Sequence, residues 1–487
     1  MTEPTLYELS SPGRVGVRFP GSDVPQYSPP AELVRSDLPF PELAEIDVIR
    51  HFTHLSSMNY SIDKGFYPLG SCTMKYNPKI NEVTARLPGF ALTHPLQPVE
   101  TVQGNLYLMY QLQEFLKEIS GFDAVSLQPA AGAQGEFTGM KIIDAYHKSR
   151  GDVKRTRVII PDSAHGTNPA TSSMIGLEVV HLPSDKRGNV DLAALKEICD
   201  DTISGLMLTN PNTLGLFDEN VCEVIEIVHA AGGLVYGDGA NLNALLGITR
   251  PGDLGFDVMH FNLHKTFSTP HGGGGPGSGP VAVTAELADF LPSPIVSIVE
   301  EASDDVPPLY GFIDPPQSIG RVKTFFGQFG MLVRAYTYIR MHGPDGLRKV
   351  SEYAVLNANY LLSKVRHKYT LPYGRICMHE FVVEGVWPDL PDIHALDIAK
   401  RLMDYDFHPP TNYFPLIVHE ALMIEPTETE NMQTLDAFAD ALLKIADEAR
   451  SDPELLKNAP HNTPVSRLDE VKAAKELVLC CWLPEKE

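Results

Sequence analysis

The sequence lacks a long apolar run, an excess of basic charge and a secretion signal. No apolar run approaches the ~18 residues that a membrane-spanning helix needs. The chain has 39 Lys and Arg against 62 Asp and Glu. A net charge of −23 argues against binding to the phosphate backbone of nucleic acid. The N-terminus has neither the basic start nor the apolar segment of a signal peptide. We therefore expect a cytoplasmic protein that binds neither membranes nor nucleic acid.

Cysteine is also scarce, and several common site motifs are missing. The 487 residues hold six cysteines and no C-x-x-C pair, which suits free thiols in a reducing compartment. His379-Glu380 and His419-Glu420 lack the second histidine of the zinc motif H-E-x-x-H. The G-x-G-x-x-G pattern at 272–277 is followed by a strand-like run instead of a helix. We expect no metal site and no Rossmann-type dinucleotide site.

Changes in composition and periodicity predict three regions. Residues 1–60 are expected to form an extended N-terminal arm, because the stretch to about Pro41 is rich in proline and acidic residues without clear periodicity. This arm wraps a partner or the protein body, with plain disorder as the alternative. Residues 61–335 are expected to form a large cofactor-binding domain, and residues 336–487 a smaller C-terminal α+β domain.

Short apolar runs alternate with amphipathic helices in the large domain. The runs that predict strands span 157–160, 177–182, 206–208, 234–236 and 258–263. Between them, apolar spacing predicts one helix that ends at Gly121 and another that Asp218 caps. Strands that alternate with helices indicate βαβ units and a mainly parallel sheet covered on both faces. The expected fold class is α/β.

The smaller domain has a different pattern. Helical spacing of apolar residues spans 355–365 and 435–445. Short apolar runs at 381–383 and 416–418 between these helices predict strands. This mixture is typical of an α+β domain.

Two charged residues stand where predicted strands end, which is where ligands bind in open α/β sheets. Lys265 follows an apolar run directly. A lysine held there out of water suits Schiff-base chemistry with a carbonyl cofactor, although a solvated lysine is the commoner case. Asp238 ends the preceding strand, where a carboxylate can keep a pyridine nitrogen protonated; a turn or a helix cap is the alternative.

A histidine and a loop of small residues complete this set. His165 follows another strand and offers a flat ring that can stack on an aromatic ring, although an ordinary hydrogen-bonding role is more common. The loop at 128–136 leads into a helix, whose free N–H groups suit a phosphate; a tight turn without a ligand is the alternative, and the loop alone does not decide between them. Together with Lys265 and Asp238, these elements follow the chain order of pyridoxal phosphate enzymes with the aminotransferase-like fold.

Longer motifs resemble a known family. They are YPLGSCTMKYNP at 67–78, HGTNPA at 165–170, TNPNTLGLF at 209–217, DGAN at 238–241, NLHKTF at 262–267, PHGGGGPGSGP at 270–280, HPPT at 408–411 and IEPTE at 424–428. These stretches resemble the glycine decarboxylase family, the P-protein of the glycine cleavage system. The resemblance runs from about His54 to about Arg467, which is nearly the whole chain.

The resemblance implies a fold-type I pyridoxal phosphate enzyme. It implies decarboxylation of glycine and transfer of the aminomethyl group to the lipoyl arm of the H-protein. The chain resembles the lysine-bearing second subunit of the split form, so a companion subunit is expected, with two of each chain. Two alternatives stay open at this point: another pyridoxal phosphate enzyme, such as an amino-acid decarboxylase or aminotransferase, and a non-catalytic scaffold subunit.

The resemblance also implies roles for individual residues. By position, Lys265 carries pyridoxal 5'-phosphate covalently, Asp238 pairs with the ring nitrogen, and His165 stacks on the ring. The remaining residues expected near the cofactor are Ala133 and Gln134 in the phosphate loop, then Thr209, Asn212, Ala240, Asn262 and His264. For the glycine carboxylate, the candidates are Ser71, Cys72, Thr73 and Arg321.

Overall fold

The chain divides into two compact units. The structure is a computed structural model that describes residues 3–35, 38–271, 277–303 and 307–477. One unit holds residues 1–65 and 460–487, and the other holds residues 66–459. Most of the glycine-rich stretch within 272–277 lies outside the described residues. No helix in the described part of the chain is both long enough and apolar enough to cross a membrane.

The first unit has little regular structure. Its elements are α1 (Leu6–Leu9), η1 (Ala31–Leu33), α2 (Glu45–Met58) and α16 (Glu470–Lys475). Residues 11–35 are exposed, and Phe19 and Tyr27 are 88% and 83% exposed. The helix α2 was not expected from the sequence. It begins where the Asp47 carboxylate accepts a hydrogen bond from the Ala44 N–H at 3.0 Å, which satisfies a donor at the helix start.

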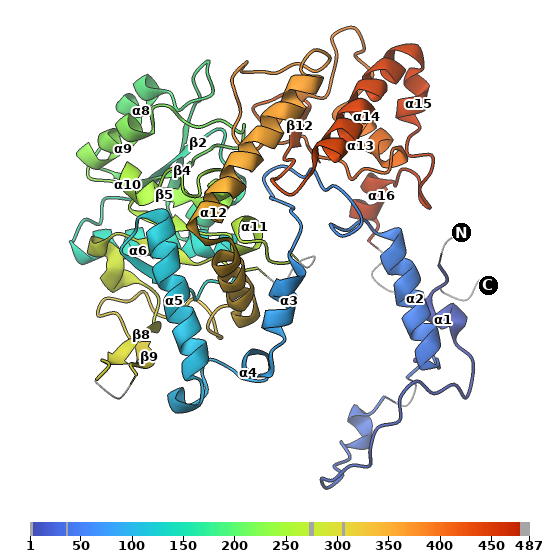
Figure 1. The fold of residues 1–487 in the computed structure, drawn as a ribbon, viewed down its shortest axis with the longest axis horizontal. Coiled ribbons are helices and arrows are strands. Elements are labelled where there is room, and N and C mark those ends of the chain that lie inside the picture. The colour runs from blue at the N-terminus through green and yellow to red at the C-terminus, as the bar shows by residue number, and fades with distance from the viewer. Residues whose placement is uncertain (1–2, 36–37, 272–276, 304–306, 478–487) are drawn as a thin grey trace. The chain divides into compact units, whose positions relative to one another are not determined.

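A seven-stranded sheet organises the larger unit (Figure 1). In spatial order its strands are β1 (Ala124–Ser126), β7 (Val281–Val283), β6 (Val258–His260), β5 (Leu234–Asp238), β4 (Ile203–Thr209), β2 (Arg157–Pro161) and β3 (Glu178–Leu182). Strands β6, β5, β4, β2 and β3 pair in parallel, and β7 runs antiparallel to both of its neighbours. The predicted α/β fold with a mainly parallel sheet is confirmed.

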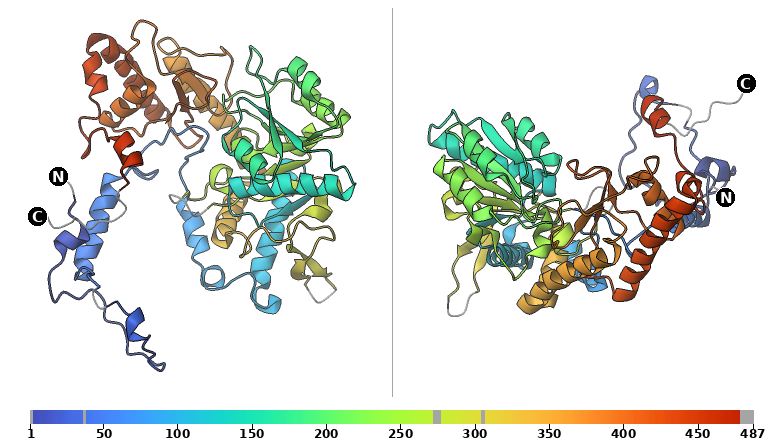
Figure 2. Two further views of the ribbon diagram at one scale, coloured as in Figure 1. Left: turned by 180° about the vertical axis from the view of Figure 1, so that it is seen from behind. Right: turned by 90° about the horizontal axis from the view of Figure 1, so that it is seen from above.

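Helices cover both faces of this sheet. They are α5 (Gln103–Ser120), α6 (Gly132–Ser149), α7 (Thr167–Met174), α8 (Leu192–Ile198) and α9 (Val221–Ala230). Helix α5 lies in front of the sheet in Figure 1, whereas α6 comes to the front in the rear view of Figure 2. Each face has its own apolar core, because strand residues alternate between the two sides. Helix α5 ends at Gly121, whose φ of 79° is left-handed, as the sequence predicted.

Shorter elements connect these layers. They are α3 (Lys79–Ala85), α4 (Pro88–Ala91), η2 (Val99–Thr101), η3 (Gly239–Ala244), α10 (Pro251–Leu254), α11 (Leu263–Thr266) and η4 (Ala285–Phe290), with a hairpin of β8 (Ile295–Glu300) and β9 (Leu309–Ile313). Two of them, η3 and α11, follow directly on β5 and β6. They carry the chain away from the carboxyl ends of parallel strands, where the candidate residues lie.

A second core belongs to a three-stranded antiparallel sheet. Its spatial order is β10 (Phe381–Glu384), β12 (Ala421–Ile424) and β11 (Thr411–Asn412), with helices α13 (Ala395–Asp404), α14 (Met432–Ser451) and α15 (Pro453–Lys457). The long helix α12 (Phe329–Val365) packs in both cores and kinks at Gly343, which precedes a proline. This smaller α+β region matches the expectation of a second core near the C-terminal end.

Three local predictions were wrong. Asn220, not Asp218, caps α9; the Asp218 carboxylate instead accepts from the Val190 and Asn220 N–H groups at 2.7 and 2.8 Å. The run at 258–263 is a strand only as far as His260, because the chain then turns into α11. The run at 416–418 is not a strand, and Leu416 there is 85% exposed. Apolar runs of three to six residues do not distinguish a strand from a packed turn.

We expect Gly239→Ala to destabilise the large domain. A Cβ added at Gly239, directly after Asp238, would lie 1.9 Å from the backbone oxygen of His260. Because backbone cannot move aside locally, β5 and β6 would have to shift, and we expect a loss of about 1–3 kcal/mol in the free energy of unfolding. Denaturant titration of wild type and variant measures this difference in the free energy of unfolding.

Gly166→Ala is the matched control for Gly239→Ala. Its added Cβ meets no heavy atom within 4 Å, and its φ of −60° suits alanine. Equal stabilities for the two variants would contradict the steric argument.

Candidate active site

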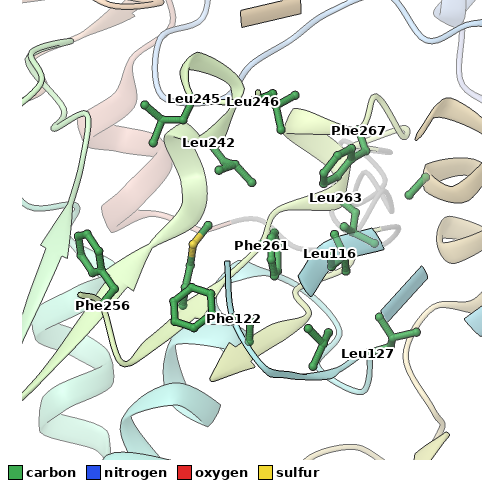
Figure 3. Packing of buried hydrophobic residues seen from close by; sticks show 14 of the residues in the cluster. Leu116, Phe122, Leu127, Leu242, Leu245, Leu246, Phe256, Phe261, Leu263 and Phe267 are labelled. Atoms are coloured by element: carbon green, nitrogen blue, oxygen red, sulfur yellow. The ribbon is translucent and has the colours of Figure 1, made fainter. Parts of the chain in front are cut away.

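Lys265 lies on the short helix α11 at the carboxyl end of β6. The side chains of Leu263 and Phe267, on either side of it, are fully buried in the large core. Figure 3 shows both lying among apolar side chains that include Leu116 and Leu127. Lys265 itself is only half-buried. The packed neighbours therefore hold the backbone of α11 in place and leave the lysine amine facing the site.

The amine of Lys265 contacts a turn from a distant part of the sequence. Its Nζ donates a hydrogen bond to the Ser71 backbone oxygen at 2.7 Å. Ser71 and Thr73 have φ values of 64° and 43°, and burial raises the pKa of the Cys72 thiol between them, against the opposing charge of Lys265. The structure thus brings the predicted 71–73 turn to the predicted lysine.

Asp238 ends β5 and is buried beside Lys265. Its carboxylate accepts from the Ala240 N–H at 2.9 Å and from Asn168 Nδ2 at 3.3 Å, and His260 Nε2 lies 3.6 Å away. Burial alone raises the pKa of Asp238, but the effect of His260, the Ala240 N–H, Lys265 and Asn168 outweighs it, so the pKa lies below its ordinary value. Asp238 is therefore a stable buried anion.

A second acid, Glu136, shares a hydrogen-bond network with Asp238. The Glu136 carboxyl accepts from Thr167 Oγ1 at 2.8 Å and from Asn168 Nδ2 at 3.1 Å, so Asn168 bridges the two acids. Burial, and then the charge of Asp238, raise the pKa of Glu136 to about 8. Two neighbouring acids whose pKa values move apart are typical of a site that holds one proton and one charge.

The N-terminus of α6 forms a narrow cradle. A Cβ added at Gly132 would lie 2.5 Å from Asn262 Oδ1, and one added at Gly279 would lie 2.0 Å from the Ala131 oxygen. The hydroxyl of Ser278 is buried there without a hydrogen-bond partner among the described residues. Backbone N–H groups at the start of an 18-residue helix and an unused hydroxyl fit a phosphate group.

The two predicted phosphate-loop residues have different positions. Ala133 is exposed on the first turn of α6. Gln134 closes the loop: its Oε1 accepts from the Ala130 N–H at 2.6 Å, and its Nε2 donates to the Val322 oxygen at 2.5 Å. Arg321, next to Val322, is exposed and stands beside this loop.

His165 and His264 lie on two sides of the site. The exposed ring of His165 is 5.4 Å from the Phe414 ring, within the electrostatic reach of Asp238 and Lys265. His264 Nδ1 accepts from the Ser278 N–H at 3.3 Å. Burial, and then the charge of neighbouring groups, lower the pKa of His264 to about 3, so its ring is neutral.

The remaining residues predicted near the cofactor mainly fix the local backbone around the site. Thr209 is the register partner of Asp238 across β4 and β5, and its buried hydroxyl has no partner among the described residues. Asn212 folds its own turn, since its side chain bonds the Gly188 oxygen and the Leu214 N–H. Ala240 contributes its N–H to Asp238, as above. Asn262 caps the start of α11 and its Nδ2 lies 2.7 Å from His260 Nε2.

Several residues of the site were missed from the sequence. They are Glu136, Asn168, His260, Glu380 and Glu425. Asn168 stands inside the HGTNPA motif and Glu136 inside the small-residue loop, so both were within reach of the sequence argument. Glu425 also stands inside a quoted motif, IEPTE, but nothing in the sequence connects it or Glu380 with Lys265, because only the packing of the smaller sheet brings them to the 71–73 turn.

Comparison with known proteins adds an independent observation. The sequence profile of the glycine cleavage system P-protein matches residues 23–384, and that of the glycine dehydrogenase C-terminal domain matches residues 350–461. The chain belongs to the glycine cleavage system P-protein family. Residues 23–384 include Lys265, Asp238 and the α6 cradle, so the P-protein match covers the site described above.

Relatives of full length support the same membership. The probable glycine dehydrogenase (decarboxylating) subunit 2 of Alkaliphilus oremlandii is 58% identical over 479 residues, covering 97% of this chain and 97% of that protein. The protein with the same description from Desulforamulus reducens is also 58% identical, over 492 residues and 100% of both chains. The expected family and the expected glycine decarboxylase class of enzyme are confirmed.

Solved structures show the same fold at low sequence identity. A crystal structure of glycine decarboxylase (P-protein) in inhibitor-bound form has a TM-score of 0.72 at 20% identity, covering 85% of this chain and 93% of that one. Glutamate decarboxylase of Lactobacillus brevis has a TM-score of 0.64 at 14% identity, covering 88% and 96%. The expected fold-type I architecture is confirmed, and with P-protein membership so is pyridoxal phosphate as cofactor.

Glu136→Gln should change how stability depends on pH. In the folded protein Glu136 keeps its proton to about pH 8, whereas an unfolded glutamate ionises near 4.5. The folded state therefore binds more protons between these values, and wild-type stability falls as the pH rises. Glutamine cannot ionise, so the stability of the variant relative to wild type should grow from pH 5 to pH 8, measured by denaturant titration at each pH.

Glu223→Gln is the control for Glu136→Gln. It removes an exposed carboxylate that pairs with Lys196 at 2.9 Å, and its stability relative to wild type should stay level over the same range. A level difference for Glu136→Gln as well would mean that Glu136 is ionised in the folded protein.

Proposed function

We propose that this chain is the lysine-bearing subunit of a two-subunit P-protein that works in the cytoplasm. It decarboxylates glycine on pyridoxal phosphate held at Lys265 and passes the aminomethyl group to the lipoyl arm of the H-protein. The bond between the carboxylate and Cα of glycine breaks, and a bond forms between that carbon and one lipoyl sulfur. The other sulfur ends as a thiol, so the disulfide is the oxidant.

The observation that carries this proposal is the joint placement of an amine, an anion and a phosphate cradle. Lys265, Asp238 and the α6 N-terminus come from separate segments and meet at the carboxyl ends of parallel strands. When bound, pyridoxal phosphate supplies a conjugated ring that accepts the electron pair left behind as CO₂ departs. A solvated lysine would need neither the buried Asp238 nor the cradle; Asp238 also caps the start of η3 through the Ala240 N–H.

The protein residues then have separate roles. The Lys265 amine holds the cofactor and, when free, carries protons. The Asp238 anion would pair with the ring nitrogen of the bound cofactor and favour its protonated form, and the α6 N-terminus with Ser278 would hold the phosphate. His165 would stack on the ring. The 71–73 turn stands beside the lysine and remains one candidate partner for the glycine carboxylate; Arg321 is the alternative carboxylate partner.

The full-length relatives favour this function over another pyridoxal phosphate reaction. Relatives described as probable glycine dehydrogenase (decarboxylating) subunit 2 are 56–58% identical over nearly all of the chain. An aminotransferase or amino-acid decarboxylase would share Lys265 and Asp238 but would need no lipoyl partner. A non-catalytic scaffold would need neither residue.

The partners follow from the same comparison. A subunit 2 implies a companion subunit, and we infer an assembly of two of each chain, because closed two-fold symmetry is the commonest arrangement. The exposed N-terminal segment supports a wrapped contact: Phe19, Tyr27 and Phe40 are 88%, 83% and 73% exposed. Several large exposed apolar side chains within one short segment are typical of a segment that binds another protein.

Lys265→Ala should abolish covalent attachment of the cofactor. Borohydride reduction of the wild type with pyridoxal phosphate should fix the cofactor on the peptide that contains Lys265, as seen by mass spectrometry. In Lys265→Ala the adduct should be absent, and glycine–bicarbonate exchange should fall to background. Lys196→Ala, an exposed lysine, is the control and should label normally. An adduct at Lys75 or any other lysine in the wild type would refute the assignment.

The chain alone should be inactive in glycine cleavage. A pocket completed by a companion subunit has incomplete walls without it, so exchange with lipoyl H-protein should be at background for the purified chain and should appear when the companion is added. Cofactor load and mass are measured on the same samples. Full activity from a self-associated chain without its companion would contradict the two-subunit proposal.

A further inference from the structure

Two buried glutamates bind backbone N–H groups of the 71–73 turn, whose Ser71 carbonyl contacts Lys265. Glu380 Oε2 accepts from the Ser71 N–H at 2.6 Å, and Glu425 Oε2 accepts from the Thr73 N–H at 2.9 Å. Both glutamates are fully buried. Two buried carboxyl groups bound to neighbouring backbone N–H groups are uncommon, because removing each carboxyl from water costs free energy.

The smaller sheet places these glutamates side by side. Glu380 immediately precedes β10 and Glu425 immediately follows β12, and the adjacent residues Phe381 and Ile424 are register partners. The chain before the turn joins the same sheet, since Leu69 bridges Ile424 and the Glu425 N–H donates to the Pro68 oxygen at 3.2 Å. The turn is therefore fixed by the smaller sheet on one side and meets Lys265 of the large domain on the other.

The turn needs this support because of its conformation. Ser71 and Thr73 both have positive φ, which is uncommon for serine and strained for a β-branched threonine. Such residues persist only where the surroundings over-determine them. The two carboxyl groups bind the two N–H groups, and this orientation turns the Ser71 carbonyl toward Lys265 Nζ, 2.7 Å away.

The two acids do not both carry a charge at neutral pH. Burial raises the pKa of Glu425 to about 7, and burial followed by the nearness of Glu425 raises that of Glu380 well above its ordinary value. His379 lies between them, with Nε2 3.9 Å from the Oε1 of each, and burial lowers its pKa to about 3. Glu380, Glu425 and His379 therefore supply hydrogen-bond acceptors near Lys265 while carrying little net charge.

We propose that Glu380 and Glu425 are positioning residues for Lys265, which act through the backbone of the 71–73 turn to fix the carbonyl that receives the lysine amine whenever it is free. The proposal rests on the proposed function of Lys265. It follows that Glu425→Gln should work nearly as well as glutamate, because its amide oxygen still accepts the Thr73 N–H. Glu380→Gln keeps an acceptor for the Ser71 N–H but turns its amide NH2 toward Asn241 Nδ2, which donates to Glu380 Oε1 at 3.3 Å, so we expect an intermediate effect there. Alanine should not work, because it leaves a buried N–H without an acceptor.

The experiment compares Glu380→Ala, Glu380→Gln, Glu425→Ala and Glu425→Gln with wild type. Hydrogen exchange of the peptide that contains Ser71 and Thr73 should speed up by about tenfold or more in the alanine variants and change little in Glu425→Gln. The rate at which added pyridoxal phosphate is trapped on Lys265 by borohydride should fall by a similar factor in the alanine variants. With companion subunit and lipoyl H-protein, kcat should fall more than KM for glycine rises.

Glu448→Ala is the matched control. It removes a partly buried glutamate that pairs with Arg401 at 2.9 and 3.0 Å in the smaller domain, away from the turn. Its melting temperature should fall, while exchange at the turn and trapping at Lys265 stay at wild-type values. A loss of trapping in this control as large as in Glu380→Ala would attribute the effect to general destabilisation and overturn the proposal.

Two further outcomes distinguish this proposal from the assignment of Lys265 itself. If the wild type is not trapped at Lys265, the proposed function fails. If the wild type is trapped but both alanine variants are trapped at the wild-type rate, only the positioning role is overturned. The same holds if Glu425→Gln fails as badly as Glu425→Ala, because charge and not N–H binding would then be the requirement.

Discussion

The site depends on how charge is divided among the four buried carboxyl groups around the Lys265 amine. Lys265 is surrounded by Glu136, Asp238, Glu380 and Glu425, each largely or fully buried. Four buried anions near one cation would cost far more than their pairing returns, so most of these acids must stay protonated. Asp238 is the acid whose hydrogen bonds and neighbours keep its pKa low, and it is the one that faces the cofactor ring in our proposal.

This division of charge is produced by ordinary fold elements. The ends of β5 and β6 place Asp238 and Lys265 next to each other, because adjacent parallel strands end at the same edge of the sheet. The 71–73 turn then joins the smaller sheet to that edge, with Glu380 and Glu425 on one side and the lysine amine on the other. Chemistry in the large domain is thus tied to packing in the smaller one.

Much of the fold and part of the site followed from the sequence. The strands β2 to β6 and the end of α5 were readable because apolar periodicity and a left-handed glycine act locally. Short elements were not readable: α11 was taken as the end of a strand, and Asp218 was taken as a cap. In both cases one or two hydrogen bonds decide the local structure, and periodicity does not report single hydrogen bonds.

The sequence by itself determined which residues can carry the chemistry, because a lysine after an apolar run and an aspartate at a strand end are unusual locally. It also determined the family, because the motifs are long. Only the tertiary structure decided which acids stay protonated and what supports the lysine. Glu380 and Glu425 reach the turn across 309 and 352 residues of sequence. Burial and the register of β10 with β12 place them there, and both are properties of the packed chain, not of any local segment.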